Sequence, residues 1–339
     1  MLNVKFLQIE PTTRCNFKCG FCCGRRMAQK DLSFEIFAGL VESLPQVFHV
    51  ELQGEGEPFM HAEIFKMVRF ARAREIRISL ITNGSLLSSR TIDEIVNTEI
   101  DKLLVSIESA NPDVFRQIRG GSLSKVVAGI KRLNQTKKAH NRSKPSIGFA
   151  TILLRQTKDD FAGIVDLYRG LELSGGIAVQ MLQTMDFYTQ FYDDKTNREQ
   201  LSAAEQIESL MALRADFGLE LAGDDKTTGF YGELFTGWRP GEGRCPWLDG
   251  GMFVNARGQP SACCLMKKPQ LVTPFGERNN DSLLRQFSLM RDSMRASLAA
   301  GVIPAACDGC GIARAALKPN RRQAPIPPRL PRRLSIIQG

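Results

Sequence analysis

The chain has 339 residues, of which 43% are hydrophobic and 24% are charged. These values are typical of a folded globular protein and exclude general disorder. No apolar stretch is long enough to cross a bilayer, and the N-terminal segment MLNVKFLQIE lacks the basic and apolar regions of a secretory signal. We therefore expect a soluble, cytoplasmic protein with no membrane partner.

The net charge of +9 suggests a nucleic-acid partner, but the distribution of the charge argues against one. Seven basic residues and no acidic one lie between Gly311 and Gly339, so the rest of the chain carries an excess of only two. The same segment is rich in proline, which favours an extended or flexible basic tail over a folded basic face. This distribution disfavours nucleic acid as a partner.

Six short apolar segments predict β-strands, at 4–9, 48–53, 76–82, 102–108, 146–154 and 177–183. Helical segments are expected between them, at 32–44, 61–74, 88–98, 111–136 and 158–173. Strands that alternate with helices imply right-handed crossovers and a parallel sheet. The pattern predicts an α/β fold, a partial (β/α)6 TIM-like barrel.

The pattern changes at about residue 223, after a further helical stretch at 199–217. From there the chain is glycine-rich and irregular, and it contains five of the nine cysteines. An odd cysteine count without a secretory signal favours metal or redox chemistry over disulfides. We expect a barrel over 1–222, a small metal-stabilised domain over 223–315 and a basic, proline-rich tail over 316–339.

Residues with functional chemistry follow the predicted strands, as the barrel fold requires of an active site. A cysteine cluster follows the first strand, GEGEP (54–58) the second and NGS (83–85) the third. The remaining strands end in Ser106 and Glu108, in Arg155 and in the segment 180–183. The predicted site therefore draws on every strand.

Cys15, Cys19 and Cys22 have the spacing C-x3-C-x2-C in a short loop. A structural zinc site normally needs four ligands. Three thiolates on a 4Fe–4S cubane instead leave one iron free to bind another molecule. A zinc knuckle or buried thiols remain the alternatives.

The segment CNFKCGFC resembles the signature of the radical S-adenosylmethionine (AdoMet) superfamily. This resemblance implies a 4Fe–4S cluster whose unique iron binds AdoMet, and reductive cleavage of AdoMet to a 5′-deoxyadenosyl radical. It also implies a flavodoxin- or ferredoxin-type electron donor. The AdoMet-binding residues implied by the resemblance and by their strand-end positions are Phe21, Gly54, Glu55, Gly56, Glu57, Asn83, Ser106, Glu108, Arg119, Gln180 and Met181.

The C-terminal cysteines are similar to those of the SPASM and twitch extensions of this superfamily. The segment RCPWLDGGMFVNARGQPSACC is followed by CDGC, and Gly258 precedes Cys263 by five positions. The resemblance implies a single auxiliary 4Fe–4S cluster, giving two clusters in all, held by Cys245, Cys263, Cys307 and Cys310. Tetrahedral zinc suits the same four thiolates and is the alternative.

The resemblance implies an oxidoreductase, and we expect oxidation of a sugar or cyclitol alcohol in natural-product biosynthesis. The candidate contacts or bases for this small polar substrate are Arg155, Gln183, Asp186 and Tyr188. No G-x-G-x-x-G fingerprint of a nicotinamide enzyme follows a strand.

Three alternatives remain: radical carbon–carbon coupling of a nucleoside or sugar, modification of a ribosomal peptide, and a redox-sensing nucleic-acid-binding protein. The chain begins at the first barrel strand, so we expect no N-terminal leader-recognition domain, which disfavours the peptide.

Overall fold

The computed structural model describes residues 2–217, 232–235, 237–276 and 280–317. Its strands are β1 (Phe6–Ile9), β2 (His49–Leu52), β3 (Arg77–Thr82), β4 (Lys102–Ser106), β5 (Ser146–Leu153), β6 (Ile177–Met181), β7 (Gly251–Val254) and β8 (Pro260–Ser261). Its α-helices are α1 (Phe34–Glu42), α2 (Ile64–Arg72), α3 (Ser89–Asn97), α4 (Pro112–Arg119), α5 (Leu123–Ala139), α6 (Phe161–Gly170), α7 (Asp186–Thr189), α8 (Asp194–Arg198), α9 (Ala203–Phe217), α10 (Gly232–Phe235), α11 (Pro246–Gly250), α12 (Asn280–Ala299) and α13 (Gly311–Leu317). Short 3-10 helices are η1 (Cys23–Arg26), η2 (Pro58–Met60), η3 (Lys158–Asp160) and η4 (Ala305–Cys307).

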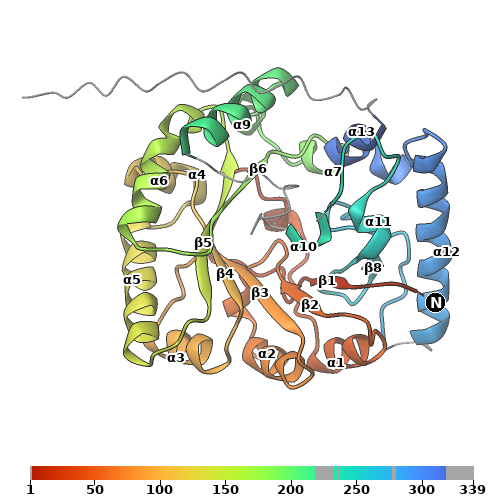
Figure 1. Cartoon of the computed structure of the whole chain (residues 1–339), viewed down its shortest axis with the longest axis horizontal. Helices are drawn as coiled ribbons and strands as arrows, with labels where there is room; N and C mark the ends of the chain where they lie inside the picture. Colours follow the sequence, from red (N-terminus) through yellow and green to blue (C-terminus); the bar gives the residue numbers. More distant parts are fainter. Residues whose placement is uncertain (1, 218–231, 236, 277–279, 318–339) are drawn as a thin grey trace, which may run out of the picture.

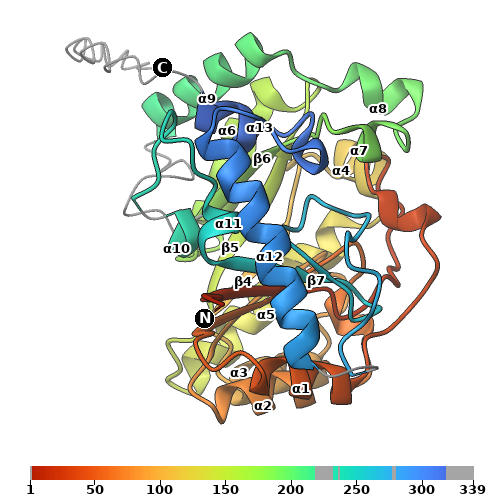
Figure 2. The same cartoon turned by 90° about the vertical axis from the view of Figure 1, so that its right-hand side faces the viewer.

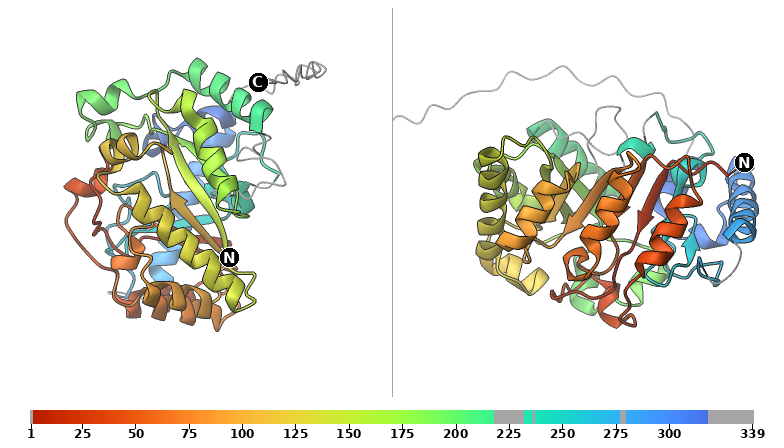
Figure 3. Two further views of the ribbon diagram at one scale, coloured as in Figure 1. Left: turned by 90° about the vertical axis from the view of Figure 1, so that its left-hand side faces the viewer. Right: turned by 90° about the horizontal axis from the view of Figure 1, so that it is seen from below.

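The described strands form one eight-stranded sheet with the order β6-β5-β4-β3-β2-β1-β7-β8. Neighbouring strands from β6 to β7 pair in parallel, and only β8 runs antiparallel to its neighbour. Figure 1 shows α1, α2, α3, α5 and α6 around the outside of the curved sheet, and Figure 3 shows the molecule from the left-hand side of that view and from below. The predicted α/β partial barrel and its six strands are confirmed.

Side chains alternate between the two faces of the sheet, as the strand geometry requires. The outward residues Leu7, Ile9, Val50, Leu80 and Phe149 belong to the large apolar core beneath the helices. The side chains that face the barrel interior are of two kinds, apolar and polar. A small apolar group of Ile81, Leu104, Ala150 and Ala178 lies inside the barrel, and buried polar residues occupy the β1, β2 and β3 positions. The barrel interior is therefore partly polar.

The predicted helix over 111–136 is two helices, because a glycine pair interrupts it. Gly120 ends α4 with a φ of 74°, a left-handed conformation that favours glycine. A Cβ on Gly121 would lie only 2.1 Å from the ring of Phe17. This close contact packs the α4–α5 junction against the cysteine loop that follows β1.

The C-terminal region extends the barrel sheet, since β7 pairs in parallel with β1. Its apolar residues Trp247, Phe253, Met294 and Leu298 form one core with barrel residues such as Phe6. Figure 2 shows α12 running along the side of the molecule, over β7. The C-terminal region is thus fixed to the first strand of the barrel, next to the loop that carries the N-terminal cysteines.

The predicted boundary at residue 222 and most of the basic tail lie outside the described residues. Within the described ranges, no helix combines the length and the apolar character needed to cross a membrane.

Candidate active site

The loop after β1 carries Cys15, Cys19 and Cys22, which lie beside the ends of β2, β3 and α4. Each thiol meets a polar group from a different segment: Cys15 Sγ lies 3.8 Å from Asn83 Nδ2, Cys19 Sγ lies 3.6 Å from Arg119 Nη1, and Cys22 Sγ lies 3.4 Å from Glu55 Oε2. Burial raises the pKa of Cys19, and the Cys15 thiol adds to this rise. The three sulfurs therefore converge on one place.

These thiols fit a cubane better than a single ion. Among the described residues, no three His, Cys, Asp or Glu side chains lie close enough to hold one metal ion. A 4Fe–4S cubane puts each thiolate on a different iron, so its ligands stand farther apart than those of one ion. Cys23 is 1% exposed and packs in the apolar core of the C-terminal region instead.

The GEGEP segment lies against the end of β1, and its glycines are required there. A Cβ on Gly54 would lie 2.2 Å from Glu10 Cγ, and one on Gly56 would lie 2.2 Å from the Thr12 carbonyl oxygen. These distances leave no room for a side chain. The glycines therefore bring the segment beside the cysteine loop.

The two glutamates of this segment have different roles. The Glu57 carboxylate accepts hydrogen bonds from the Thr82 hydroxyl at 2.7 Å and from the Asn83 amide at 2.6 Å, which ties the ends of β2 and β3 together. Glu55 instead faces Cys22 and accepts from Lys267 Nζ at 2.7 Å. Although burial acts in the opposite direction, Lys267 holds the pKa of Glu55 below its usual value.

Glu108 and Arg119 form a buried ion pair with two hydrogen bonds. The Glu108 side chain is fully buried, so it depends on the guanidinium for compensation. Burial lowers the pKa of Arg119, but Glu108 and the Cys19 and Cys22 thiols together raise it by more, and the guanidinium stays charged next to Cys19. Glu108 is predicted to bind AdoMet, and in the structure each of its carboxylate oxygens accepts a hydrogen bond from this guanidinium.

A cavity of about 540 Å³ opens at the carboxyl ends of the strands. It is lined by Cys15, Cys19 and Cys22 and by every residue predicted to bind AdoMet: Phe21, Gly54, Glu55, Gly56, Glu57, Asn83, Ser106, Glu108, Arg119, Gln180 and Met181. Trp238, Trp247, Lys267 and Ile312 line it from the C-terminal region. The structure therefore gathers these predicted residues around one space.

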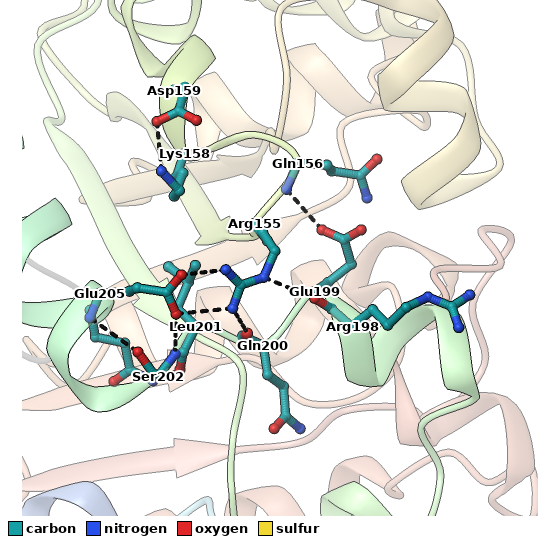
Figure 4. Close-up of polar contacts among 11 residues, drawn as sticks. Arg155, Gln156, Lys158, Asp159, Arg198, Glu199, Gln200, Leu201, Ser202 and Glu205 are labelled. Atoms are coloured by element: carbon teal, nitrogen blue, oxygen red, sulfur yellow. Dashed lines mark hydrogen bonds and ion pairs between the residues drawn. The ribbon is translucent and has the colours of Figure 1, made fainter.

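Two of the four predicted substrate contacts do not line this cavity. Arg155 is turned away, since its guanidinium pairs with Glu205 and donates to the carbonyl oxygens of Arg198 and Gln200 (Figure 4). Asp186 is exposed at the start of α7. Arg155 and Asp186 each come after a strand, as predicted. The loop that carries each residue turns outward, so its side chain points away from the cavity.

Gln183 and Tyr188 do line the cavity. The Tyr188 hydroxyl donates to the Cys264 carbonyl oxygen at 3.5 Å. Burial raises the pKa of Tyr188 well above its usual value of about 10. The hydroxyl therefore stays protonated at neutral pH and can donate a hydrogen bond, which favours the role of a contact among the two roles, contact or base, predicted for it.

The four C-terminal cysteines predicted as ligands also come together. Cys245 precedes α11, Cys263 follows β8, Cys307 ends η4, and Cys310 directly precedes α13. Burial raises the pKa of Cys263 well above its usual value, and the thiols of Cys264, Cys245, Cys310 and Cys307 raise it further. Four thiols supplied by separate segments of one small core fit an auxiliary cluster.

Lys267 and Gln8 are among the cavity residues that were not predicted from the sequence. Lys267 follows the Cys263–Cys264 pair closely, in CCLMKK, but nothing in that segment indicates a buried ion pair. Gln8 offered a signal, since it is a polar residue within the apolar strand VKFLQI.

Comparison with known proteins assigns the barrel to a family. Residues 9–168 match the Radical SAM superfamily model. This part of the chain is a radical SAM domain, and the resemblance seen in CNFKCGFC is confirmed.

Curated relatives resemble parts of the chain. The tungsten-containing aldehyde ferredoxin oxidoreductase cofactor-modifying protein of Pyrococcus furiosus is 26% identical over 188 residues, which are 54% of this chain and 52% of that protein. The GTP 3',8-cyclase of Rhizobium meliloti is 34% identical over 139 residues, 38% of this chain and 39% of the cyclase. The chain thus matches about half or less of these relatives.

Solved structures share the fold over almost the whole chain. SuiB of Streptococcus suis bound to S-adenosylmethionine has a TM-score of 0.68 and 15% identity, covering 93% of this chain and 72% of SuiB. Native anSMEcpe with bound AdoMet has a TM-score of 0.63 and 13% identity, covering 92% of this chain and 88% of anSMEcpe. At this identity the likeness concerns the fold alone.

Proposed function

We propose that this chain is a radical SAM enzyme that removes a hydrogen atom from a small polar substrate and oxidises an alcohol of a sugar or cyclitol. The observation that carries the proposal is the cavity shared by the three thiols, the strand-end polar groups and the C-terminal region. Its volume lies within the usual range for small-molecule sites.

In this proposal Cys15, Cys19 and Cys22 hold a 4Fe–4S cluster. When bound, the cluster and AdoMet supply a radical that abstracts hydrogen from a carbon atom. The chain provides the surroundings. Arg119 keeps a positive charge beside Cys19, and Phe21 lies with its ring 5.6 Å from that guanidinium. Because Arg119 occupies the Glu108 carboxylate, the Ser106 hydroxyl is the better candidate for a ribose contact.

Oxidation of an alcohol to a carbonyl removes one hydrogen atom, one proton and one electron from the substrate. The electron needs an acceptor, and we assign that role to an auxiliary cluster held by Cys245, Cys263, Cys307 and Cys310. Tyr188 lies at the cavity wall and donates to the main chain of Cys264, beside the ligand Cys263. Tyr188 thereby positions the ligand loop against the substrate space.

Two other radical reactions have support from the relatives. The similarity to GTP 3',8-cyclases favours a coupling reaction on a nucleotide. The likeness to SuiB, which has also been solved bound to precursor peptide SuiA, favours a peptide substrate. We rank both below alcohol oxidation, because the matches cover only part of the cyclases and share only the fold with SuiB.

Anaerobic incubation separates these possibilities. The reconstituted protein is given AdoMet, dithionite and, in turn, scyllo-inositol, glucosamine, GTP or a cysteine-containing peptide, and 5′-deoxyadenosine and products are measured by mass spectrometry. We expect 5′-deoxyadenosine, increased by a hydroxyl compound that loses two mass units. A product of unchanged mass from GTP favours coupling, a changed peptide favours peptide modification, and no 5′-deoxyadenosine contradicts the enzyme assignment.

A further inference from the structure

The loop that carries the three thiols is strongly basic. Between residues 14 and 30 the sequence has no acidic residue and five basic ones: Arg14, Lys18, Arg25, Arg26 and Lys30. Of the net charge of +9, seven charges lie beyond residue 310 and five lie in this loop, so the rest of the chain has a net charge of −3. The loop is therefore positive against a slightly acidic remainder of the chain before residue 311.

Four of these cations have no acidic partner. Lys18, Arg25, Arg26 and Lys30 are exposed, and none of them forms an ion pair within the residues that the structure describes. Arg14 is different, because its guanidinium lies 2.6 Å from the Asp31 carboxylate. We call the four exposed and unpaired residues the basic face.

A second basic stretch, in and after α5, shows the contrast. Residues 121–150 contain seven basic residues and no acidic one. Five of the seven are engaged by the chain itself: Lys138, Arg142 and Lys144 pair with Glu172, Glu99 and Asp101, and Arg132 and Lys137 donate to main-chain carbonyl oxygens. Paired cations attract a partner less, since the acid cancels part of their field. The basic face keeps its charge for a partner.

The basic face lies next to the thiols. Lys18 directly precedes Cys19, and Arg25 Nη1 donates to the Lys18 carbonyl oxygen at 3.1 Å, which holds Arg25 at the same part of the loop. Figure 2 shows the red loop that follows β1 at the right-hand edge of the molecule, and the left panel of Figure 3 shows it at the left-hand edge. A cluster held by the thiols therefore lies close to a charged outer edge of the protein.

The helix beside the loop cancels little of this charge. A Cβ on Gly20 would lie 3.3 Å from Thr196 Oγ1, so α8 packs against the loop. Hydrogen bonds from Thr196 lower the pKa of Asp193, and Arg25 is near enough to add to this effect. With the residues that flank it, α8 has a net charge of −1, from Asp193, Asp194, Lys195, Arg198 and Glu199. The positive excess of the basic face remains.

The loop offers charge without exposed aromatic rings. Proteins that bind single-stranded nucleic acid combine a positive groove with aromatic side chains on which bases stack. Phe17 is 7% exposed and packs edge-to-face on Phe115, with 6.3 Å between the ring centroids, and Phe21 lines the cavity. The basic face therefore suits an acidic protein better than a nucleic acid.

We propose that the basic face docks a small acidic electron-carrier protein of the flavodoxin or ferredoxin type, which reduces the cluster. This inference rests on the proposed function, because reductive cleavage consumes one electron for each AdoMet. The electron passes from the reduced flavin or iron–sulfur group of the carrier to the oxidised cluster, and no atom is transferred. Complementary charge gives fast, salt-sensitive association, which suits the small and weak interfaces of redox partners.

The test measures association directly, with a flavodoxin and a plant-type ferredoxin as probes. The Kd of each carrier for anaerobically reconstituted protein is measured by biolayer interferometry at low salt. The test variant is Arg26→Glu/Lys30→Glu. The control Arg90→Glu/Lys131→Glu makes the same change of charge at exposed residues of α3 and α5, which form no ion pair within the described residues. For the carrier that binds wild type, we expect the Kd to rise at least tenfold in the test variant and less than twofold in the control.

The iron and sulfide content shows whether the test variant still holds its clusters. The milder variant Arg26→Gln/Lys30→Gln, with an expected rise in Kd of at least threefold, carries the test if the reversed charges cause loss of iron. Equal Kd values in the test variant and the control overturn the docking face, as does failure of both carriers to bind wild type.

A titration with tRNA examines the other class of partner. Tight binding of tRNA that is lost in the test variant, without any loss of carrier binding, would assign the basic face to nucleic acid and overturn the proposal. Failure of the proposed function has a different signature, which is the absence of 5′-deoxyadenosine when dithionite replaces the carrier.

Discussion

Lys267 Nζ lies 2.7 Å from Glu55 Oε1, and this ion pair joins the C-terminal region to the segment that follows β2. The Lys267 side chain is only 6% exposed and the Glu55 side chain 15%. Glu55 Oε2 is also 3.4 Å from Cys22 Sγ. One lysine therefore links the cysteine-rich C-terminal region to a thiol of the radical SAM domain.

Replacing Lys267 should destabilise the protein, because it leaves the buried Glu55 carboxylate without a counter-charge. We expect Lys267→Met to lower the free energy of unfolding by about 3–5 kcal/mol. The double variant Lys267→Met/Glu55→Gln should recover most of this loss. Anaerobic urea unfolding followed by circular dichroism measures both, and a single variant as stable as wild type would contradict the importance of the pair.

Glu51 should make the stability fall as the pH rises. Burial raises its pKa in the folded chain to about 8, from an ordinary value near 4.5. Between about pH 5 and pH 8 the folded chain keeps a proton that the unfolded chain has released, which costs up to about 1.4 kcal/mol per pH unit. Glu51→Gln removes this proton, so its advantage over wild type in urea unfolding should be larger at pH 8 than at pH 5.5. An advantage that does not depend on pH would show that Glu51 is already ionised.

Two neighbouring cysteines should differ in their effect on metal content. Cys263 is grouped with the other three C-terminal ligands, and Cys264 lines the active-site cavity. We expect Cys263→Ala to lose about half of the iron and sulfide of the anaerobically reconstituted protein, since one of two clusters disappears. Cys264→Ala should keep its full content. The reverse result would exchange the two assignments, and zinc in place of iron would replace the auxiliary cluster with a structural site.

Arg119 and Arg155 each form an ion pair with a glutamate, so variants of the two residues can be compared directly. Arg119 lines the cavity beside Cys19, whereas Arg155 lies outside it. We expect Arg119→Ala to lower the rate of 5′-deoxyadenosine formation at least tenfold and Arg155→Ala to change it less than twofold. Because the Arg155 pair is solvent-exposed, its loss should leave the stability close to that of wild type. Equal rates in the two variants would show that Arg119 does not belong to the AdoMet site.

The strands could be predicted from the sequence because each one combines local signals. In β3 and β4, β-branched and aliphatic residues run between a charged residue and a polar turn, which marks the strand without knowledge of its neighbours. The same locality applies to CNFKCGFC. The glycine pair at 120 and 121 was also a local signal, and the structure shows that it divides the predicted helix.

The features that could not be predicted from the sequence depend on tertiary contacts. The pairing of β7 with β1 joins residues more than two hundred positions apart, and no local pattern indicates it. The role of Lys267 depends on that pairing. Arg155 was misplaced for the same reason, because its direction is set by Glu205 on α9.

The proposed chemistry requires three thiols to hold a cluster able to cleave AdoMet, and one measurement tests this most directly. Anaerobically reconstituted wild type and the variant Cys15→Ala/Cys19→Ala/Cys22→Ala are compared for 5′-deoxyadenosine formed from AdoMet and dithionite. We expect product from wild type and none from the variant, which should retain the auxiliary iron. Product from both proteins, or from neither, would contradict the account.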